Sequence, residues 1–222
     1  MKEIRFFGHD FVLHPAGILI WPQENLAVVA DLHLEKASFY ARHGQFLPPQ
    51  ESFETLRALS DQLEFCSVKK LILLGDSFHD SHGFSRMDEP SKKMLDALTA
   101  RYEFIWVTGN HDKDFIPDNA EIYHDYILQN LTFRHEAVPE TQGEISGHFH
   151  PKVRFLLKGQ RINHPCFIAD QTRMILPAYG TLTGGMDIFL PPFDTLFTKD
   201  FTAHILGKEQ IYSIPSAKFL RK

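Results

Sequence analysis

Short clusters of aspartate, asparagine and histidine recur along the chain, and their side chains are oxygen and imidazole donors of the kind that bind divalent metal ions. In chain order the clusters are Asp31-Leu32-His33, Gly75-Asp76, Gly109-Asn110-His111-Asp112, His135 and Gly147-His148-Phe149-His150. Each cluster alone is common by chance. Their order and shared context indicate a site that holds two ions, which can stabilise both the attacking and the leaving oxygen of a phosphoryl transfer.

That shared context is the end of a short apolar run. Residues 26–30 lead into Asp31, residues 71–74 lead into Gly75-Asp76, and residues 104–107 lead into Gly109-Asn110. Such runs are typical of buried parallel strands, and the helical patterns between them predict β-α-β units. Because ligand sites in open α/β sheets form beyond the carboxyl ends of the strands, we expect these donors to meet at one sheet edge.

The remaining patterns predict a mostly α/β first half and a mostly β second half. Residues 11–13 and 18–21 are expected to form a hairpin, and helices are expected over 34–43, ending at Gly44, over 50–65, and from about Pro90. Short strands are expected over 126–128, 131–135, 144–146, 153–157, 166–169 and 174–176. We find no repeat or long linker, so residues 1–222 are interpreted as a single α/β domain.

The donors divide into two ligand sets around one bridging carboxylate. Asp76 is the expected bridge because it follows the central strand of the three. The first ion is assigned Asp31, His33 and His150, and the second is assigned Asn110, His135 and His148. If residues 148–150 form a plain strand, both imidazoles point to one face. This mixture of imidazole and carboxylate suits Mn, Fe or Zn better than Ca.

Two further histidines are candidates for direct roles in catalysis. His111 follows a ligand and cannot easily share its metal, so we interpret it as the general acid that protonates the leaving group. His79 is expected either to contact phosphate or partner His111, or to be a solvated loop residue. His82 and Arg86 are expected to be solvated, and a role for Tyr179 in lining the pocket stays open.

Composition sets limits on partners and location. The 222 residues are 43% hydrophobic and 23% charged, and the formal net charge is −5, so no overall basic field attracts nucleic acid. Cys66 and Cys166 have no metal-binding spacing and are interpreted as buried thiols in a reducing compartment. The first eleven residues lack the apolar core of a signal peptide, and no run is long enough to span a membrane, so we expect a cytoplasmic protein.

The ordered set of metal-binding motifs resembles that of the calcineurin-like metallophosphoesterase superfamily. This resemblance implies a four-layer α/β/β/α sandwich and a dinuclear site, often loaded with manganese. It assigns the bridge to Asp76, the ligand roles to the six residues above, and the catalytic histidine to His111.

A closer likeness, to the bacterial DNA-ligase-associated metallophosphoesterases, extends over nearly the whole chain. It is carried by DLHLEK (31–36), GDSFHD (75–80), FRHE (133–136) and TGG (183–185). It implies a role in DNA repair beside a ligase and a helicase. Many phosphatase branches have aspartate where this chain has His79, and the repair nucleases of the superfamily have histidine.

Three functions remain open at this point. The first is a phosphodiesterase or nuclease that acts on DNA ends, and the second is a phosphomonoesterase or pyrophosphatase for a small nucleotide-type metabolite. The third is a metal-bound scaffold without activity, against which the presence of His111 argues. Because the net charge is −5, duplex binding is expected to be weak and salt-sensitive, which favours single-stranded or frayed ends.

Overall fold

The computed structural model of the protein describes residues 1–110, 121–157, 159–197 and 200–219. One sheet contains, in spatial order, β1 (Lys2–Phe6), β2 (His9–Leu13), β3 (Leu19–Trp21), β4 (Leu26–Val29), β5 (Lys70–Leu74), β6 (Glu103–Val107) and β7 (Glu121–Tyr123). Strands β1 to β4 pair antiparallel, and β4 to β7 pair parallel. The carboxyl ends of β4, β5 and β6 therefore share one edge, as predicted.

The second sheet is built from the later part of the chain. Its spatial order is β14 (Met186–Asp187), β11 (Pro151–Leu157), β12 (Gln160–Ala169), β13 (Arg173–Ile175), β10 (Glu144–Ser146), β9 (Leu131–Arg134) and β8 (Asp125–Leu128). Strand β15 (Thr202–Leu206) pairs with β12, and β16 (Ile211–Pro215) pairs with β15. Strands β9, β10 and β13 are parallel neighbours.

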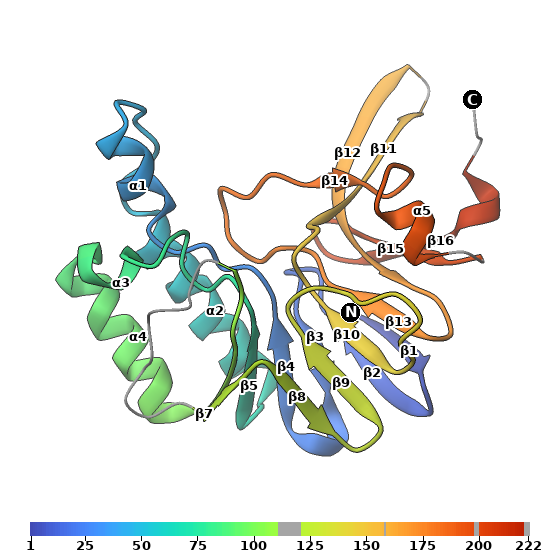
Figure 1. The fold of residues 1–222 in the computed structure, drawn as a ribbon, viewed down its shortest axis with the longest axis horizontal. Helices are drawn as coiled ribbons and strands as arrows, with labels where there is room; N and C mark the ends of the chain where they lie inside the picture. Colours follow the sequence, from blue (N-terminus) through green and yellow to red (C-terminus); the bar gives the residue numbers. More distant parts are fainter. Residues whose placement is uncertain (111–120, 158, 198–199, 220–222) are drawn as a thin grey trace.

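Helices cover the outer face of the first sheet. They are α1 (Lys36–Arg42), α2 (Glu51–Cys66), α3 (Gly83–Arg86) and α4 (Glu89–Arg101), and they lie together at the left of Figure 1. The periodic leucines of α2 and α4 face the sheet: Leu56, Leu59, Leu63, Leu95 and Leu98 are buried. Asp88 caps α4 by accepting a hydrogen bond from the backbone N–H of Ser91.

Three clusters of buried apolar residues separate four layers. The first lies between the two sheets and includes Trp21, Ile72, Phe133 and Ile145. The second joins the first sheet to α2 and α4. The third packs the outer face of the second sheet against α5 (Phe193–Leu196) and the chain around it. The α/β/β/α sandwich is therefore confirmed, and the outer layer over the second sheet is thin, with the short helix α5 packed in it.

The strands and helices predicted from apolar runs are all present, with ends shifted by a few residues. The elements missed are of three kinds. No predicted pattern covers strands β1, β15 and β16. Strands β7 and β14 are very short, with three and two residues, and so are helices α3 and α5, with four residues each. Cys166 is buried as expected, Cys66 is only half-buried, and both thiols are free. Within the described ranges, none of the helices has the length and apolar character needed to cross a membrane.

Candidate metal centre

The loops that follow β4 and β5 are joined by backbone hydrogen bonds. The N–H groups of Asp31, His33 and Leu34 donate to the carbonyls of Gly75, Asp76 and Ser77, at 3.2, 2.9 and 2.9 Å. On the other side of the first loop, Tyr179 N–H donates to the Ala30 carbonyl and Gly180 N–H to the Asp31 carbonyl, at 2.8 and 3.2 Å. The candidate ligands therefore stand on loops that are held on both sides.

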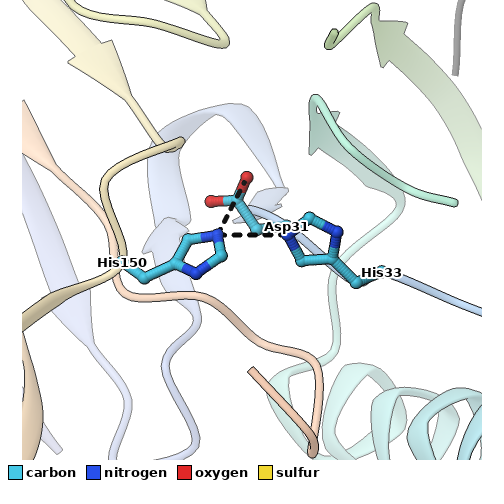
Figure 2. Close-up of side chains that lie close together, drawn as sticks. All are labelled: Asp31, His33 and His150. Carbon is cyan, nitrogen blue, oxygen red and sulfur yellow. Dashed lines mark hydrogen bonds and ion pairs between the residues drawn. The ribbon is translucent and has the colours of Figure 1, made fainter. Parts of the chain in front are cut away.

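The first donor group consists of Asp31, His33 and His150. The Nε2 atoms of the two imidazoles lie 3.2 Å apart, and His150 Nε2 lies 3.6 Å from Asp31 Oδ1. Figure 2 shows the imidazoles facing each other beside the Asp31 carboxylate. Asp31 and His33 come from the edge of the first sheet, whereas His150 directly precedes β11 of the second sheet.

The second donor group consists of Asp76, His135 and His148. His135 Nε2 lies 3.4 Å from Asp76 Oδ2 and 3.0 Å from His148 Nδ1. His135 Nδ1 lies 3.4 Å from the Leu74 carbonyl, which accepts a hydrogen bond when that nitrogen carries the proton. This hydrogen bond leaves Nε2 of His135 as the atom facing the other two donors, a common way to fix the orientation of a metal-ligating imidazole.

The two groups adjoin at Asp31. Its Oδ2 accepts a hydrogen bond from His148 N–H at 2.9 Å, and its Oδ1 lies 3.7 Å from His135 Nδ1. Asp31 is fully buried, yet Oδ1 has no hydrogen-bond partner. A buried carboxylate oxygen without a partner is costly unless a cation compensates it.

The spacing of the donors also fits metal ions. Two ligands at about 2.1 Å from one ion, with a tetrahedral or octahedral angle between them, lie about 3.0–3.4 Å apart. Of four donor-to-donor distances in the groups, 3.0, 3.2 and 3.4 Å fall in this range, and one of 3.6 Å lies slightly above it. The donor groups therefore fit two divalent ions side by side.

The backbone at these residues adopts a conformation that is uncommon outside glycine. Five of the six grouped donors have positive φ: Asp31 at 55°, His33 at 47°, Asp76 at 45°, His148 at 69° and His150 at 46°. Such residues cluster at functional sites, because the surrounding structure must hold them in place. Residues 148–150 form a bend rather than the plain strand considered from the sequence, and His148 and His150 stand in different groups, as in the assignment made from the sequence.

Two glycines leave the room that the donors need. A Cβ atom on Gly75, which has φ of +77°, would lie 2.1 Å from His135 Nδ1. A Cβ atom on Gly109 would lie 2.3 Å from Asp76 Oδ1. The glycines after β5 and β6 therefore bring backbone directly against the donor side chains.

Burial lowers the pKa values of the histidines in the two groups, whereas neighbouring carboxylates raise them. Burial lowers the pKa of His33 to about 4, although Asp31 opposes this change. Burial also acts to lower the pKa of His135, but a hydrogen bond to Asp76 and the charges of Asp31 and Asp76 outweigh it and raise the pKa to about 9. The pKa of His148 is lowered by burial and by His135. The negative charges of Asp31 and Asp76 therefore favour a positive charge beside His135.

The structure describes only some of the other residues predicted from the sequence. Asn110 directly follows Gly109 at the same sheet edge, and its side chain is exposed. His111 and Asp112 lie outside the described residues. His79 is half-buried, with its ring centroid 5.8 Å from that of His33 and 4.8 Å from that of Phe39, so it is not a solvated loop residue.

The expectation that Arg86 is solvated is wrong. Its side chain is 13% exposed, and its guanidinium binds both carboxylate oxygens of Asp80 and the hydroxyl of Ser38. His82 is exposed, as expected, and Tyr179 is half-buried. Glu136, to which the sequence analysis assigns no role, has its Oε1 3.8 Å from His148 Nε2; it directly follows His135 in the FRHE segment.

With this fold and site described, comparison with known proteins assigns the chain to a family. Residues 25–191 match the calcineurin-like phosphoesterase family, so the chain belongs to that family and is a metal-dependent phosphoester hydrolase. Among solved structures it is similar to the nuclease MPE of Pseudomonas putida, with 24% identity over 96% of this chain and 99% of that one and a TM-score of 0.75. At this identity the likeness shows a shared fold.

A second similar structure is much more distant. It is Yfce, a phosphoesterase from E. coli, with 14% identity over 85% of this chain and 97% of that one and a TM-score of 0.43. No match is found among curated proteins.

Proposed function

We propose that this enzyme is a two-metal phosphodiesterase that acts on nucleic acid ends, in DNA repair beside a ligase and a helicase. The observation that carries the proposal is the convergence of two adjoining donor groups on loops from both sheets. The fold shared with a protein described as a nuclease supports a nucleic acid substrate.

In this proposal Asp31, His33 and His150 hold one ion, and His135 and His148 hold the other together with Asn110. Asp76 bridges the pair. Bound divalent ions supply Lewis-acid stabilisation for the charge that builds on the phosphoryl oxygens. The mixed imidazole and carboxylate donors favour manganese, with iron and zinc as further candidates.

The residues around the metal ligands divide the remaining tasks. His111 is the proposed general acid for the leaving oxygen, a role that needs an imidazole beside the ligands but not among them. His79 is proposed to donate a hydrogen bond to a phosphate oxygen, since it stands next to His33 and its ring is held against Phe39 and Tyr40. Arg86 holds Asp80, the residue after His79, and thereby fixes this loop to α1.

A diester is the proposed substrate rather than a monoester. A monoester dianion requires strong cationic contacts such as a forked guanidinium. Arg86 is already occupied by Asp80, and Arg134, next to His135, is paired with Asp125 and Glu144. The proposed setting is the cytoplasm, as the free thiols Cys66 and Cys166 also suggest.

The direct test is Asp76→Asn. Because this change removes one negative charge from the proposed bridging ligand, the variant is expected to lose bound metal and hydrolysis of bis-p-nitrophenyl phosphate together. Metal content is measured by mass spectrometry beside turnover in manganese. Asp96→Asn, an exposed aspartate on α4, is the matched control and should retain both properties. Full turnover of Asp76→Asn with two ions bound would remove the bridging assignment.

The substrate is tested with wild-type protein on matched single-stranded, duplex and gapped oligonucleotides in manganese. Cleavage of single-stranded or gapped DNA is expected to exceed cleavage of intact duplex. If all three remain intact while p-nitrophenyl phosphate or a nucleotide pyrophosphate is hydrolysed efficiently, the enzyme is a phosphatase or pyrophosphatase for small metabolites.

A further inference from the structure

Two lysines lie beside the first donor group and take no part in it. Lys36, the first residue of α1, lines a crevice together with His33, Glu51, Thr55 and Thr183. Lys152 stands two residues after His150, and its ammonium donates to the Thr183 carbonyl at 3.3 Å. Both side chains are half-buried. Lys36 therefore lines the crevice, and Lys152, from the other half of the sandwich, contacts Thr183 at its border.

The positions of both lysines are fixed by packing. The stem of Lys152 crosses Gly185, where an added Cβ atom would lie 2.6 Å from both Cδ and Cε of the lysine. Two neighbours fix the backbone of Lys36. Glu35 before it has a left-handed conformation, and the N–H of Ala37 after it donates to Glu51 Oε1 at 2.9 Å. The loop of residues 181–183 closes the crevice, and Thr181 Oγ1 lies 3.4 Å from Thr55 Oγ1.

The two lysines lack anionic partners of their own. Within the described part of the chain, Lys70 and Lys92 form ion pairs with glutamates, whereas Lys36 and Lys152 form none. Glu51 is the nearby carboxylate, but it is buried and already accepts hydrogen bonds from Ser52 Oγ and Ala37 N–H. Burial lowers the pKa of Lys36; the charge of Glu51 opposes this change, and the charge of Lys152 adds to it more weakly. Half-buried cations without a carboxylate partner indicate a place for an external anion.

We propose that Lys36 and Lys152 bind a second, non-scissile phosphate of a nucleic acid substrate, beside the ion held by Asp31, His33 and His150. This inference rests on the proposed phosphodiesterase function. It identifies the substrate as one with at least two phosphates, and it gives the lysines a role in binding and positioning rather than in bond cleavage. Under this inference a protein with a net charge of −5 still binds the phosphates of its substrate, because its phosphate contacts lie together near the metal centre.

The test compares Lys36→Gln, Lys152→Gln and the double variant on two substrates. Bis-p-nitrophenyl phosphate has one phosphate, and a short single-stranded oligonucleotide has several. Because a hydrogen bond to a charged group contributes about 1.5–3 kcal/mol, KM for the oligonucleotide is expected to rise about 10-fold or more in each single variant. KM for the one-phosphate substrate and kcat for both substrates should stay within about twofold of wild type. Lys69→Gln, an exposed lysine before β5 and so at the opposite edge of the sheet, is the matched control.

A second experiment measures oligonucleotide binding in the absence of turnover. Binding of a labelled oligonucleotide is followed by fluorescence anisotropy in EDTA at several salt concentrations. Each lost phosphate contact should reduce the slope of log K against log salt by about 0.7 for a single strand. Lys36→Arg keeps the charge and should keep the wild-type slope.

Three outcomes would overturn the inference. They are an unchanged oligonucleotide KM in the double variant, an unchanged salt slope in the double variant, and an equal loss on both substrates. Failure of wild type to cleave bis-p-nitrophenyl phosphate would instead remove the proposed function, and the anisotropy measurement would still decide whether the lysines bind phosphate.

Discussion

Backbone strain at the candidate ligands has a measurable cost. A left-handed conformation costs a non-glycine residue about 1–2 kcal/mol, and Asp31, His33, Asp76, His148 and His150 all adopt it. The hydrogen bonds that join the loops after β4 and β5 offset part of this cost. The donors are therefore arranged by the fold before any ion binds, which is how sites for tight and selective coordination are built.

Gly75 gives a test of this arrangement that changes no donor. In Gly75→Ala the new Cβ atom would meet His135 Nδ1 at 2.1 Å, so the imidazole must move. Because displacement of a reacting group by about 1 Å costs about 100-fold, turnover of bis-p-nitrophenyl phosphate is expected to fall by at least that factor. Metal content, measured in parallel, should fall as well.

Gly44→Ala is the matched control for that change. Gly44 has φ of +76°, almost the value at Gly75, but an added Cβ atom there meets nothing within 4 Å. Both variants are expected to lose about 1–2 kcal/mol of stability from backbone strain, and only Gly75→Ala should lose activity. Equal turnover in the two variants would show that contact with His135 is unimportant.

The grouping of the donors could be predicted from the sequence, but the local geometry could not. The apolar runs before Asp31 and Asp76 predict which strand ends meet, because a buried strand is visible in the sequence as a run of consecutive apolar residues. The turn at residues 148–150 depends on contacts with Asp31 from the other sheet, and alternation of residue types cannot reveal it. The same holds for Arg86, whose partners Asp80 and Ser38 lie 6 and 48 residues away.

Among the elements, β15 carries a titratable group with a clear effect on stability. His204 is 7% exposed, Ser213 Oγ lies 2.8 Å from its Nδ1, and burial, followed by the charge of Lys2, lowers its pKa to about 4. An unfolded histidine has a pKa of about 6.5. Between these values the unfolded chain binds a proton that the folded chain does not, so folding stability must fall as the pH falls from about 6.5 toward 4.

We expect His204 to remove about 2 kcal/mol of stability between about pH 7 and about pH 5. The measurement is urea denaturation of wild type and His204→Gln at both values, and the variant should lose less stability on acidification. His124→Gln, whose side chain is 92% exposed in the wild type, should behave like wild type. Parallel losses in wild type and His204→Gln would exclude this contribution.

Element prediction succeeded where burial is continuous and failed where it is not. All four residues of β4 are buried, and this run was recognised. In β1 the pattern begins with exposed Lys2 and Glu3 and reaches a buried residue only at Phe6, so no apolar run marks it. Helices α3 and α5 have four residues each, about one turn, which is too short for a helical spacing of apolar residues to show in the sequence.

At the scale of the whole molecule, each donor group draws on both sheets. The first combines Asp31 and His33 with His150, and the second combines Asp76 with His135 and His148. Bound ions would therefore cross-link the sheets at their shared edge, in addition to the apolar core between them. Any ligand that binds only the folded state raises stability by an amount that depends on its concentration relative to Kd.

Thermal unfolding should consequently depend on metal. At about 100 times Kd, one ion adds about 2.7 kcal/mol, which for a chain of this size raises Tm by about 5–10 °C. EDTA should reverse the rise in wild type, as followed by circular dichroism. Asp76→Asn should show a smaller metal-dependent shift, and an identical shift in both proteins would place the stabilising ions elsewhere.

The division of the donors between the sheets also acts as a safeguard during synthesis. The part of the chain up to Asn110 contains Asp31, His33 and Asp76, and His135, His148 and His150 are made later. Neither half alone contains a complete donor group, so an incomplete or half-folded chain has no intact centre with which to cut phosphoesters. If these groups form the metal centre, hydrolytic activity can therefore appear only after both sheets have docked.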